Sequence, residues 1–149
     1  MKTSIIIPTL NEARYLSETL AQIQQLSPHE IIISDGGSND NTLKIASKFT
    51  QNLIKGPAGR ALQMNAGAQV ATGDLLLFLH ADSCIERASY QKMLTAMKKT
   101  EVLGGAFSLL IDSDRWALQI INQFANLRSR YLGRAYGDQA FFVKKHVFP

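Results

Sequence analysis

Short apolar runs alternate along this chain with segments of helical period, and this alternation constrains the fold more than any other feature. The clearest runs are Ser4–Pro8, Glu30–Ser34 and Asp74–Leu79, and each is typical of a buried parallel strand. Apolar residues recur between them at spacings of three and four, which predicts helices. We therefore expect an α/β fold in one domain, residues 1–149, with a mostly parallel sheet and helices on both faces.

The remaining elements follow the same alternation. Asn11 is the expected N-cap of the first helix. Helices are predicted at 12–26, 42–49, 60–71, 87–99 and 116–131, and further strands at 52–55, 106–110 and 141–143.

Composition narrows the class of protein. Of the 149 residues, 46% are hydrophobic and 19% charged, which is typical of a globular domain. The net charge of +4 is not gathered into one block, so nucleic acid, acidic lipid and phosphorylated small molecules are all compatible with it. Phosphate-bearing small molecules need the least extra assumption, and we expect them, not nucleic acid, as partners. Cys84 stands alone, which excludes an internal disulfide. The apolar run Ile5–Ile7 is too short for a signal peptide, and a cytoplasmic location, or one peripheral to a membrane, is expected.

In a parallel sheet, ligands bind beyond the carboxyl ends of the strands. The residues just after each strand are therefore the candidates for a binding or catalytic role. After the first strand come Pro8, Thr9, Asn11 and Glu12. These residues are typical of a helix cap, and equally of a loop that lies against a nucleotide.

Asp35, Gly36 and Gly37 follow the second strand. Asp35 can accept hydrogen bonds from a base imide or a ribose hydroxyl, and the glycines permit close approach of a ligand. A plain Asx turn with a helix cap explains the same residues, and the pattern does not separate the two interpretations.

Arg60 stands at the start of a predicted helix, where it can pair with a phosphate or stack on a base. A solvated surface arginine is the simpler alternative. Asn65 lies within the same alanine-rich helix, where asparagine is a poor helix former, so we expect it to make a specific hydrogen bond.

His80 and Asp82 follow the most apolar strand. Strand period places them on one side of the chain, where both can reach one divalent cation, Mg²⁺ or Mn²⁺. The alternative is that Asp82 caps the next helix and His80 packs in the core. Asp138, before the last strand, can be a general base, a hydroxyl binder or, most simply, a turn residue.

The predicted helix Trp116–Tyr131 carries an apolar stripe flanked by arginines. An ordinary core-packing helix is the favoured interpretation. The alternative is a basic amphipathic surface for contact with a membrane or lipid phosphate.

Taken together, these segments resemble family-2 glycosyltransferases of the nucleotide-diphospho-sugar (GT-A) fold, over essentially the whole chain. The matching segments occur in the family's order: Ile5–Glu12, Ser34–Thr42, Gly59-Arg60, Asn65–Ala68, Ala71–Asp74 and His80–Ser83. A narrower resemblance is to a bacterial branch described as rSAM/selenodomain-associated or as diaponeurosporenoate glycosyltransferases. It rests on His80-Ala81-Asp82, Gly104–Phe107 and Tyr136–Gln139.

The resemblance implies an inverting, metal-assisted transfer of a sugar from a nucleotide-diphosphate donor to an acceptor hydroxyl or carboxyl. In this family the donor is commonly a UDP-sugar, and the acceptor can be lipid-like. Asp35 would read uracil or ribose, Arg60 would lie near the diphosphate, and Asp82 would bind the metal, with His80 replacing the family's first acid. The implied donor-binding residues are Pro8, Thr9, Asn11, Glu12, Asp35, Gly36, Arg60, Asn65 and Ala81. The implied acceptor-side residues are Gly105, Asp138 and Gln139.

One departure concerns the catalytic base. The family's base lies in a later Glu-Asp motif, whereas this sequence ends at Pro149. We therefore expect a truncated domain that binds donor and transfers little. A non-catalytic sugar-nucleotide-binding module and a membrane-surface interaction module are the alternatives. A nucleotidyltransferase is disfavoured, since no glycine-rich loop follows the first strand.

Overall fold

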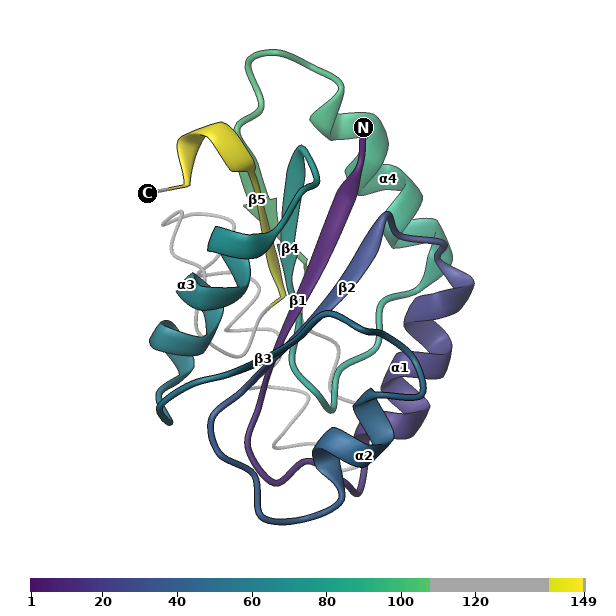
Figure 1. Ribbon diagram of the computed structural model, residues 1–149. Coiled ribbons are helices and arrows are strands. Elements are labelled where there is room, and N and C mark those ends of the chain that lie inside the picture. Colours follow the sequence, from purple (N-terminus) through teal and green to yellow (C-terminus); the bar gives the residue numbers. More distant parts are fainter. Residues whose placement is uncertain (108–139, 149) are drawn as a thin grey trace, which may run out of the picture.

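The computed structural model describes residues 1–107 and 140–148. These residues form a six-stranded sheet with the strand order β3-β2-β1-β4-β6-β5 (Figure 1). The elements are β1 (Thr3–Thr9), α1 (Leu16–Gln25), β2 (Glu30–Asp35), α2 (Thr42–Ala46), β3 (Leu53–Lys55), α3 (Arg60–Val70), β4 (Leu75–Phe78), α4 (Arg87–Met97), β5 (Gly104–Ala106), β6 (Phe141–Lys144) and a 3₁₀ turn, η1 (Lys145–Val147). The predicted helix at 116–131 lies outside the described residues.

The sheet has a parallel part and an antiparallel part. β1 lies in the middle and pairs in parallel with β2 and β4, and β2 pairs in parallel with β3. β6 runs antiparallel to both β4 and β5. The mostly parallel α/β fold expected from the strand–helix alternation is confirmed, because β1, β2, β3 and β4 run in parallel and a helix follows each of them in the sequence.

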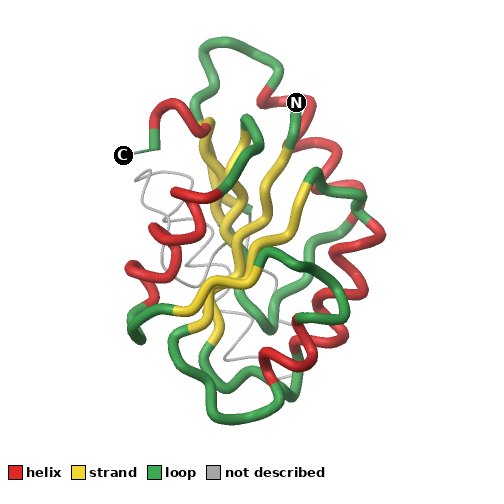
Figure 2. The backbone as a smooth tube through the Cα atoms, in the orientation of Figure 1, coloured by secondary structure: helices red, strands yellow, loops and turns green. Residues whose placement is uncertain are grey.

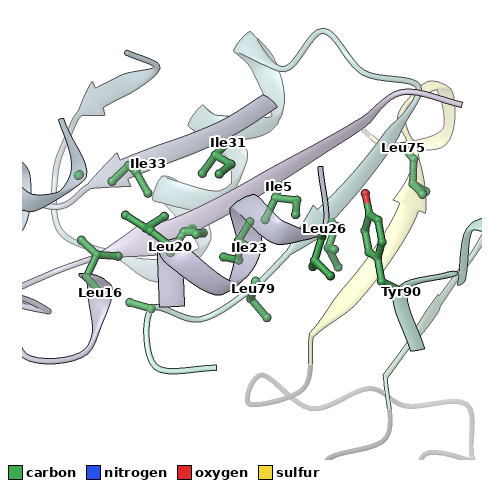
Figure 3. Close-up of a cluster of buried hydrophobic side chains, with 14 of the residues drawn as sticks. Ile5, Leu16, Leu20, Ile23, Leu26, Ile31, Ile33, Leu75, Leu79 and Tyr90 are labelled. Carbon is green, nitrogen blue, oxygen red and sulfur yellow. The ribbon is translucent and has the colours of Figure 1, made fainter. Parts of the chain in front are cut away.

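Alternate side chains of β1 pack into two separate cores on the two faces of the sheet. Helices α1, α2 and α4 cover one face of the sheet and α3 the other (Figure 1). Ile5 and Ile7 belong to the core on the first face, whereas Ile6 packs with Ala68 of α3. Figure 3 shows the larger core, in which Leu16, Leu20 and Ile23 of α1 lie over the sheet. This burial on both faces explains why the strands are uninterrupted apolar runs.

Helix α1 begins later than predicted. Its first residue is Leu16, and Asn11 is not its N-cap but has a left-handed backbone with φ 58°. The left-handed backbone of Asn11 breaks the helix there, and the N–H groups of residues 11–13 donate to Ser38, Thr42 and Asp40, which hold this segment as a turn. The predicted start at residue 12 was therefore wrong.

The strand predicted at 106–110 also begins elsewhere. β5 already includes Gly104 and Gly105, which pair with Val143 and Phe142 of β6. A Cβ atom at Gly105 would lie 2.7 Å from the Phe142 ring, so the absence of a side chain permits this pairing. Residues after 107 lie outside the described part of the strand.

The amino ends of the strands are tied together by Glu30. Its carboxylate accepts hydrogen bonds from the Ser4 hydroxyl (2.6 Å) and from the backbone N–H (2.6 Å) and hydroxyl (2.9 Å) of Thr72. Burial alone would raise the pKa of Glu30, but these hydrogen bonds hold the pKa below its ordinary value. The segment that contains Thr72 and Gly73 therefore has a structural role, far from the carboxyl ends of the strands.

Among the described residues, no helix has both the length and the apolar character that a membrane crossing requires.

Candidate functional site

The carboxyl ends of β1, β2 and β4 lie at the same edge of the sheet, the lower end in Figure 2. Three loops leave this edge, after Thr9, Asp35 and Phe78. Helix α3 begins beside them at Arg60. The segments that the sequence singled out at 8–12, 35–42 and 80–83 therefore converge at one edge, as expected for a parallel sheet.

Asp35 lies at the tip of β2 and is fully buried, with 0% of its surface exposed. Its carboxylate accepts hydrogen bonds from the hydroxyls of Thr9 (3.0 Å) and Ser38 (2.5 Å) and from the backbone N–H groups of Gly37 (3.0 Å) and Ser38 (2.8 Å). Burial would raise the pKa of Asp35, but the hydrogen bonds from Ser38, Thr9 and Gly37 outweigh burial and lower it. Asp35 is therefore an ionised carboxylate that organises its own loop.

The loops after β1 and β2 are joined by hydrogen bonds. The Asn11 N–H donates to the Ser38 hydroxyl (2.9 Å), and the Asn11 side-chain oxygen accepts from the Asn39 N–H (2.9 Å). The Glu12 N–H donates to the Thr42 hydroxyl (2.8 Å). Two loops held together in this way present a defined surface to a ligand.

Asp40 completes this connection. One of its carboxylate oxygens accepts from the N–H (2.9 Å) and hydroxyl (2.5 Å) of Thr42, and the other accepts from the Ala13 N–H (3.1 Å). The Thr42 hydroxyl contributes most to lowering the pKa of Asp40. Asp40 and Thr42 thus connect the loop after β2 to the segment after β1.

Gln63 of α3 is a positioning residue that has no sequence signal of its own, because glutamine is ordinary in helices. It is 5% exposed, and its amide donates to the carbonyls of Thr9 (2.7 Å) and Ser34 (2.8 Å). A Cβ atom at Gly36 would lie 3.1 Å from the Gln63 amide and 3.1 Å from Ala58. Gly36 therefore makes room for α3, a role that its position in a possible ligand loop did not indicate.

His80 and Asp82 do not lie on a strand. β4 ends at Phe78, and the Ser83 N–H donates to the His80 carbonyl (3.2 Å), which closes a turn. The argument from strand alternation was therefore wrong, because the chain leaves β1 after Leu79, whose N–H donates to the Ile6 carbonyl, and then turns between His80 and Ser83. The buried Ala81 is held by its carbonyl, which accepts from the hydroxyl of Thr19 in α1 (2.7 Å).

A small cavity adjoins this turn. Side chains from four segments line it: Pro8, Arg60, Met64, Phe78, Leu79, His80 and Phe141. Pro8, Arg60 and His80 were singled out from the sequence, and the fold brings them to one place. Asp35 does not line this cavity.

Negative charge gathers near the same turn. Asp82 is exposed, whereas Glu12 is partly buried. Burial raises the pKa of Glu12, and the charges of Asp82 and Asp40 raise it further. The charges of Asp82 and Asp40 therefore act on Glu12 at this edge of the sheet, and a bound cation would reduce that repulsion.

The described residues contain no cluster of three or more His, Cys, Asp or Glu side chains that could hold a metal by themselves. The exposed Asp82 still fits Mg²⁺ or Mn²⁺ bound to a diphosphate, because such ions use one or two carboxylates together with phosphate oxygens and water. His80, at the cavity, can add an imidazole ligand.

Of the remaining predicted site residues, those that the structure describes do not line the cavity. Asn65 is exposed, and no described residue hydrogen bonds to its side chain, so the expected specific hydrogen bond is absent from this part of the structure. Gly105 pairs with Phe142 at the edge of the sheet. Asp138 and Gln139 lie outside the described residues. The roles of the predicted residues toward a ligand stay predictions.

A parallel sheet whose carboxyl-end loops carry polar groups has the layout in which doubly wound α/β domains bind their ligands. The family model described as "Glycosyl transferase family 2" matches residues 4–147, and the chain belongs to this family.

Curated relatives support the assignment. The chain is 31% identical over 113 residues, 70% of its length and 35% of the relative's, to an uncharacterized glycosyltransferase from Nostoc sp.. It is 43% identical over 94 residues, 57% of its length and 37% of the relative's, to a PGL/p-HBAD biosynthesis glycosyltransferase from Mycobacterium bovis. The chain thus spans about a third of the length of these relatives.

Solved structures show the same fold, GT-A. A mannosyltransferase from Pyrobaculum calidifontis, in complex with GDP-Man and Mn²⁺, aligns with a TM-score of 0.72 at 18% identity, covering 95% of this chain and 44% of that one. Glucosyl-3-phosphoglycerate synthase from Mycobacterium tuberculosis, in complex with Mn²⁺, UDP and glucosyl-3-phosphoglycerate, aligns with a TM-score of 0.70 at 15% identity, covering 97% and 57%.

Proposed function

We propose that this domain binds a nucleotide-diphospho-sugar at the carboxyl ends of β1, β2 and β4 and serves the transfer of its sugar to an acceptor. The observation that carries the proposal is the convergence of the loops after β1, β2 and β4 at one edge of the sheet in a chain of this family. Pro8, Arg60 and His80 lie together at this edge, around a small cavity. The exposed acid Asp82 follows in the same turn as His80. A cationic side chain and an acid near a cavity fit a diphosphate with its counter-cation.

Each polar group has a proposed task. Arg60, at the start of α3, would pair with the diphosphate, since guanidinium binds phosphate oxygens in a bidentate manner. Asp82 would hold Mn²⁺ or Mg²⁺, with His80 as a further ligand. When bound, the cation would neutralise charge that develops on the leaving nucleoside diphosphate.

Finer parts of the proposal concern the donor, the acceptor and the stereochemistry. A UDP-sugar donor draws support from the UDP complex of the mycobacterial synthase, whereas the Pyrobaculum enzyme is in complex with GDP-Man. Inversion at the sugar carbon, a lipid-like acceptor hydroxyl or carboxyl, and a cytoplasmic site peripheral to a membrane rest on the family resemblance.

The first test is calorimetric titration of UDP into the chain with Mn²⁺ and then with excess chelator. We expect binding that chelator weakens strongly, and we expect Asp82→Ala to lose this metal dependence. Glu86→Ala is the matched control, because Glu86 is another exposed acid, at the start of α4. Equal UDP affinity with and without metal in the wild-type chain would contradict the role of Asp82.

A second measurement separates transfer from binding alone. The chain is incubated with UDP-glucose and Mn²⁺, and release of UDP is followed over time. Release that depends on Asp82 would support a transferase site. Metal-dependent binding without release would favour the alternative of a sugar-nucleotide-binding module.

A further inference from the structure

Asp35 stands in the middle of the candidate site, yet its carboxylate is directed at its own loop. We propose that Asp35 is a positioning residue: it holds the loops after β1 and β2 in the shape that receives the nucleotide, and it does not itself accept a hydrogen bond from the base. This inference deepens the proposed donor site and rests on it.

The first argument is hydrogen-bonding capacity. A carboxylate has about four lone-pair sites. Both oxygens of Asp35 already accept two hydrogen bonds each, one oxygen from the Thr9 and Ser38 hydroxyls and the other from the Gly37 and Ser38 N–H groups. With 0% of its surface exposed, Asp35 could bind a base only by giving up one of these partners, which would cost a hydrogen bond that holds the loop.

The second argument is connectivity. The Ser38 hydroxyl donates to Asp35 and accepts from the Asn11 N–H, so the loop after β1 is held through Ser38. The Thr9 hydroxyl ties the end of β1 directly to Asp35. One carboxylate therefore fixes two loops, including the residue that precedes Glu12.

The chemistry of the side chain supplies a discriminating pair of variants. In Asp35→Asn, the amide oxygen can still accept from the Gly37 and Ser38 N–H groups. Its NH₂ can donate to the Thr9 and Ser38 hydroxyls, whose hydrogens can rotate. Asp35→Ala removes every one of these bonds. A positioning role therefore predicts that Asp35→Asn keeps the loop hydrogen bonds that Asp35→Ala removes.

Amide hydrogen exchange tests the positioning role without any ligand. In Asp35→Ala, we expect exchange about tenfold faster at the N–H groups of Gly37, Ser38 and Asn11, with Asp35→Asn within about threefold of wild type. Asp74→Asn is the control, since Asp74 accepts from the Lys2 N–H at the opposite end of the sheet. Wild-type exchange in Asp35→Ala would overturn the proposal. If Asp35→Ala does not fold, Ser38→Ala should still speed exchange at Asn11.

Nucleotide titration tests the second half of the proposal. A carboxamide can donate where a carboxylate cannot, so direct contact with the base would change the ratio of UDP to CDP affinity in Asp35→Asn. We expect that ratio to stay at its wild-type value, and an altered ratio would overturn the inference. Failure of the wild-type chain to bind either nucleotide would instead refute the proposed function, while amide exchange would still decide whether Asp35 holds the loops.

Discussion

At the residue scale, Gln63 joins three segments of the candidate site. Its amide donates to the carbonyls of Thr9 and Ser34, at the ends of β1 and β2. Its oxygen accepts from the Gly59 N–H (3.3 Å), directly before α3. The start of α3, and Arg60 with it, is thereby held against the ends of two strands.

The contribution of Gln63 can be measured with a matched pair of variants. Gln63→Leu should lower the free energy of unfolding by about 1–3 kcal/mol, because two buried carbonyls lose a donor. Gln69→Leu, at an exposed position of the same helix, should change it by less than about 0.5 kcal/mol. Denaturant titration measures both, and equal stability of the two variants would contradict the positioning role.

At the element scale, α3 approaches β1 closely because position 67 is a glycine. A Cβ atom there would lie 2.4 Å from a side-chain methyl of the buried Ile6, well inside van der Waals contact. The small residues Ala68 and Ala71 continue the same packed face. Close packing of α3 brings Arg60 and Gln63 to the strand ends.

Substitution at Gly67 tests this packing. Gly67→Ala should lower the free energy of unfolding by about 1–3 kcal/mol, because overpacking outweighs the gain in helix propensity. Gly56→Ala is the control, since nothing lies within 4 Å of a Cβ atom at Gly56. Thermal unfolding measures the stability of the two variants. A Gly67→Ala variant more stable than wild type would contradict the prediction, because it would mean that the Ile6 side chain can move aside without loss of packing energy.

At the scale of the whole molecule, carboxylates at opposite ends of the sheet shift stability with pH in opposite directions. The pKa of Glu30 is lowered in the folded chain, so its contribution is present above its ordinary value of 4.5 and is lost as the pH falls below it. The pKa of Glu12 is raised, so ionised Glu12 destabilises the fold at neutral pH, and this cost disappears as the pH falls toward 4.5.

Two variants should separate these contributions. Glu30→Gln should lower stability at pH 7 and make the loss of stability on acidification shallower, because it removes a group with a lowered pKa. Glu12→Gln should raise stability at pH 7 and make that loss steeper. Urea unfolding between pH 7 and pH 3 measures both slopes, and the same sign for the two variants would refute the assignment.

Local sequence pattern was sufficient for the order of the described elements and for the edge of the sheet at which the site lies. Uninterrupted apolar runs such as Ile5–Ile7 identify strands that are buried on both faces. A strand with one face in water would instead alternate apolar and polar residues. Parallel connection then places all their carboxyl ends together, so Pro8, Arg60 and His80 could be selected without coordinates.

Contacts between distant segments were decided by the tertiary structure alone. Asn11 has the composition of a helix cap, but the neighbouring loop supplies partners for residues 11–13, and α1 begins at Leu16 instead. Gln63 and Thr19 carry no local signal, because their partners lie 54 and 62 residues away. Periodicity reports which face of an element is buried, whereas hydrogen bonds between loops depend on where the packed sheet brings those loops together.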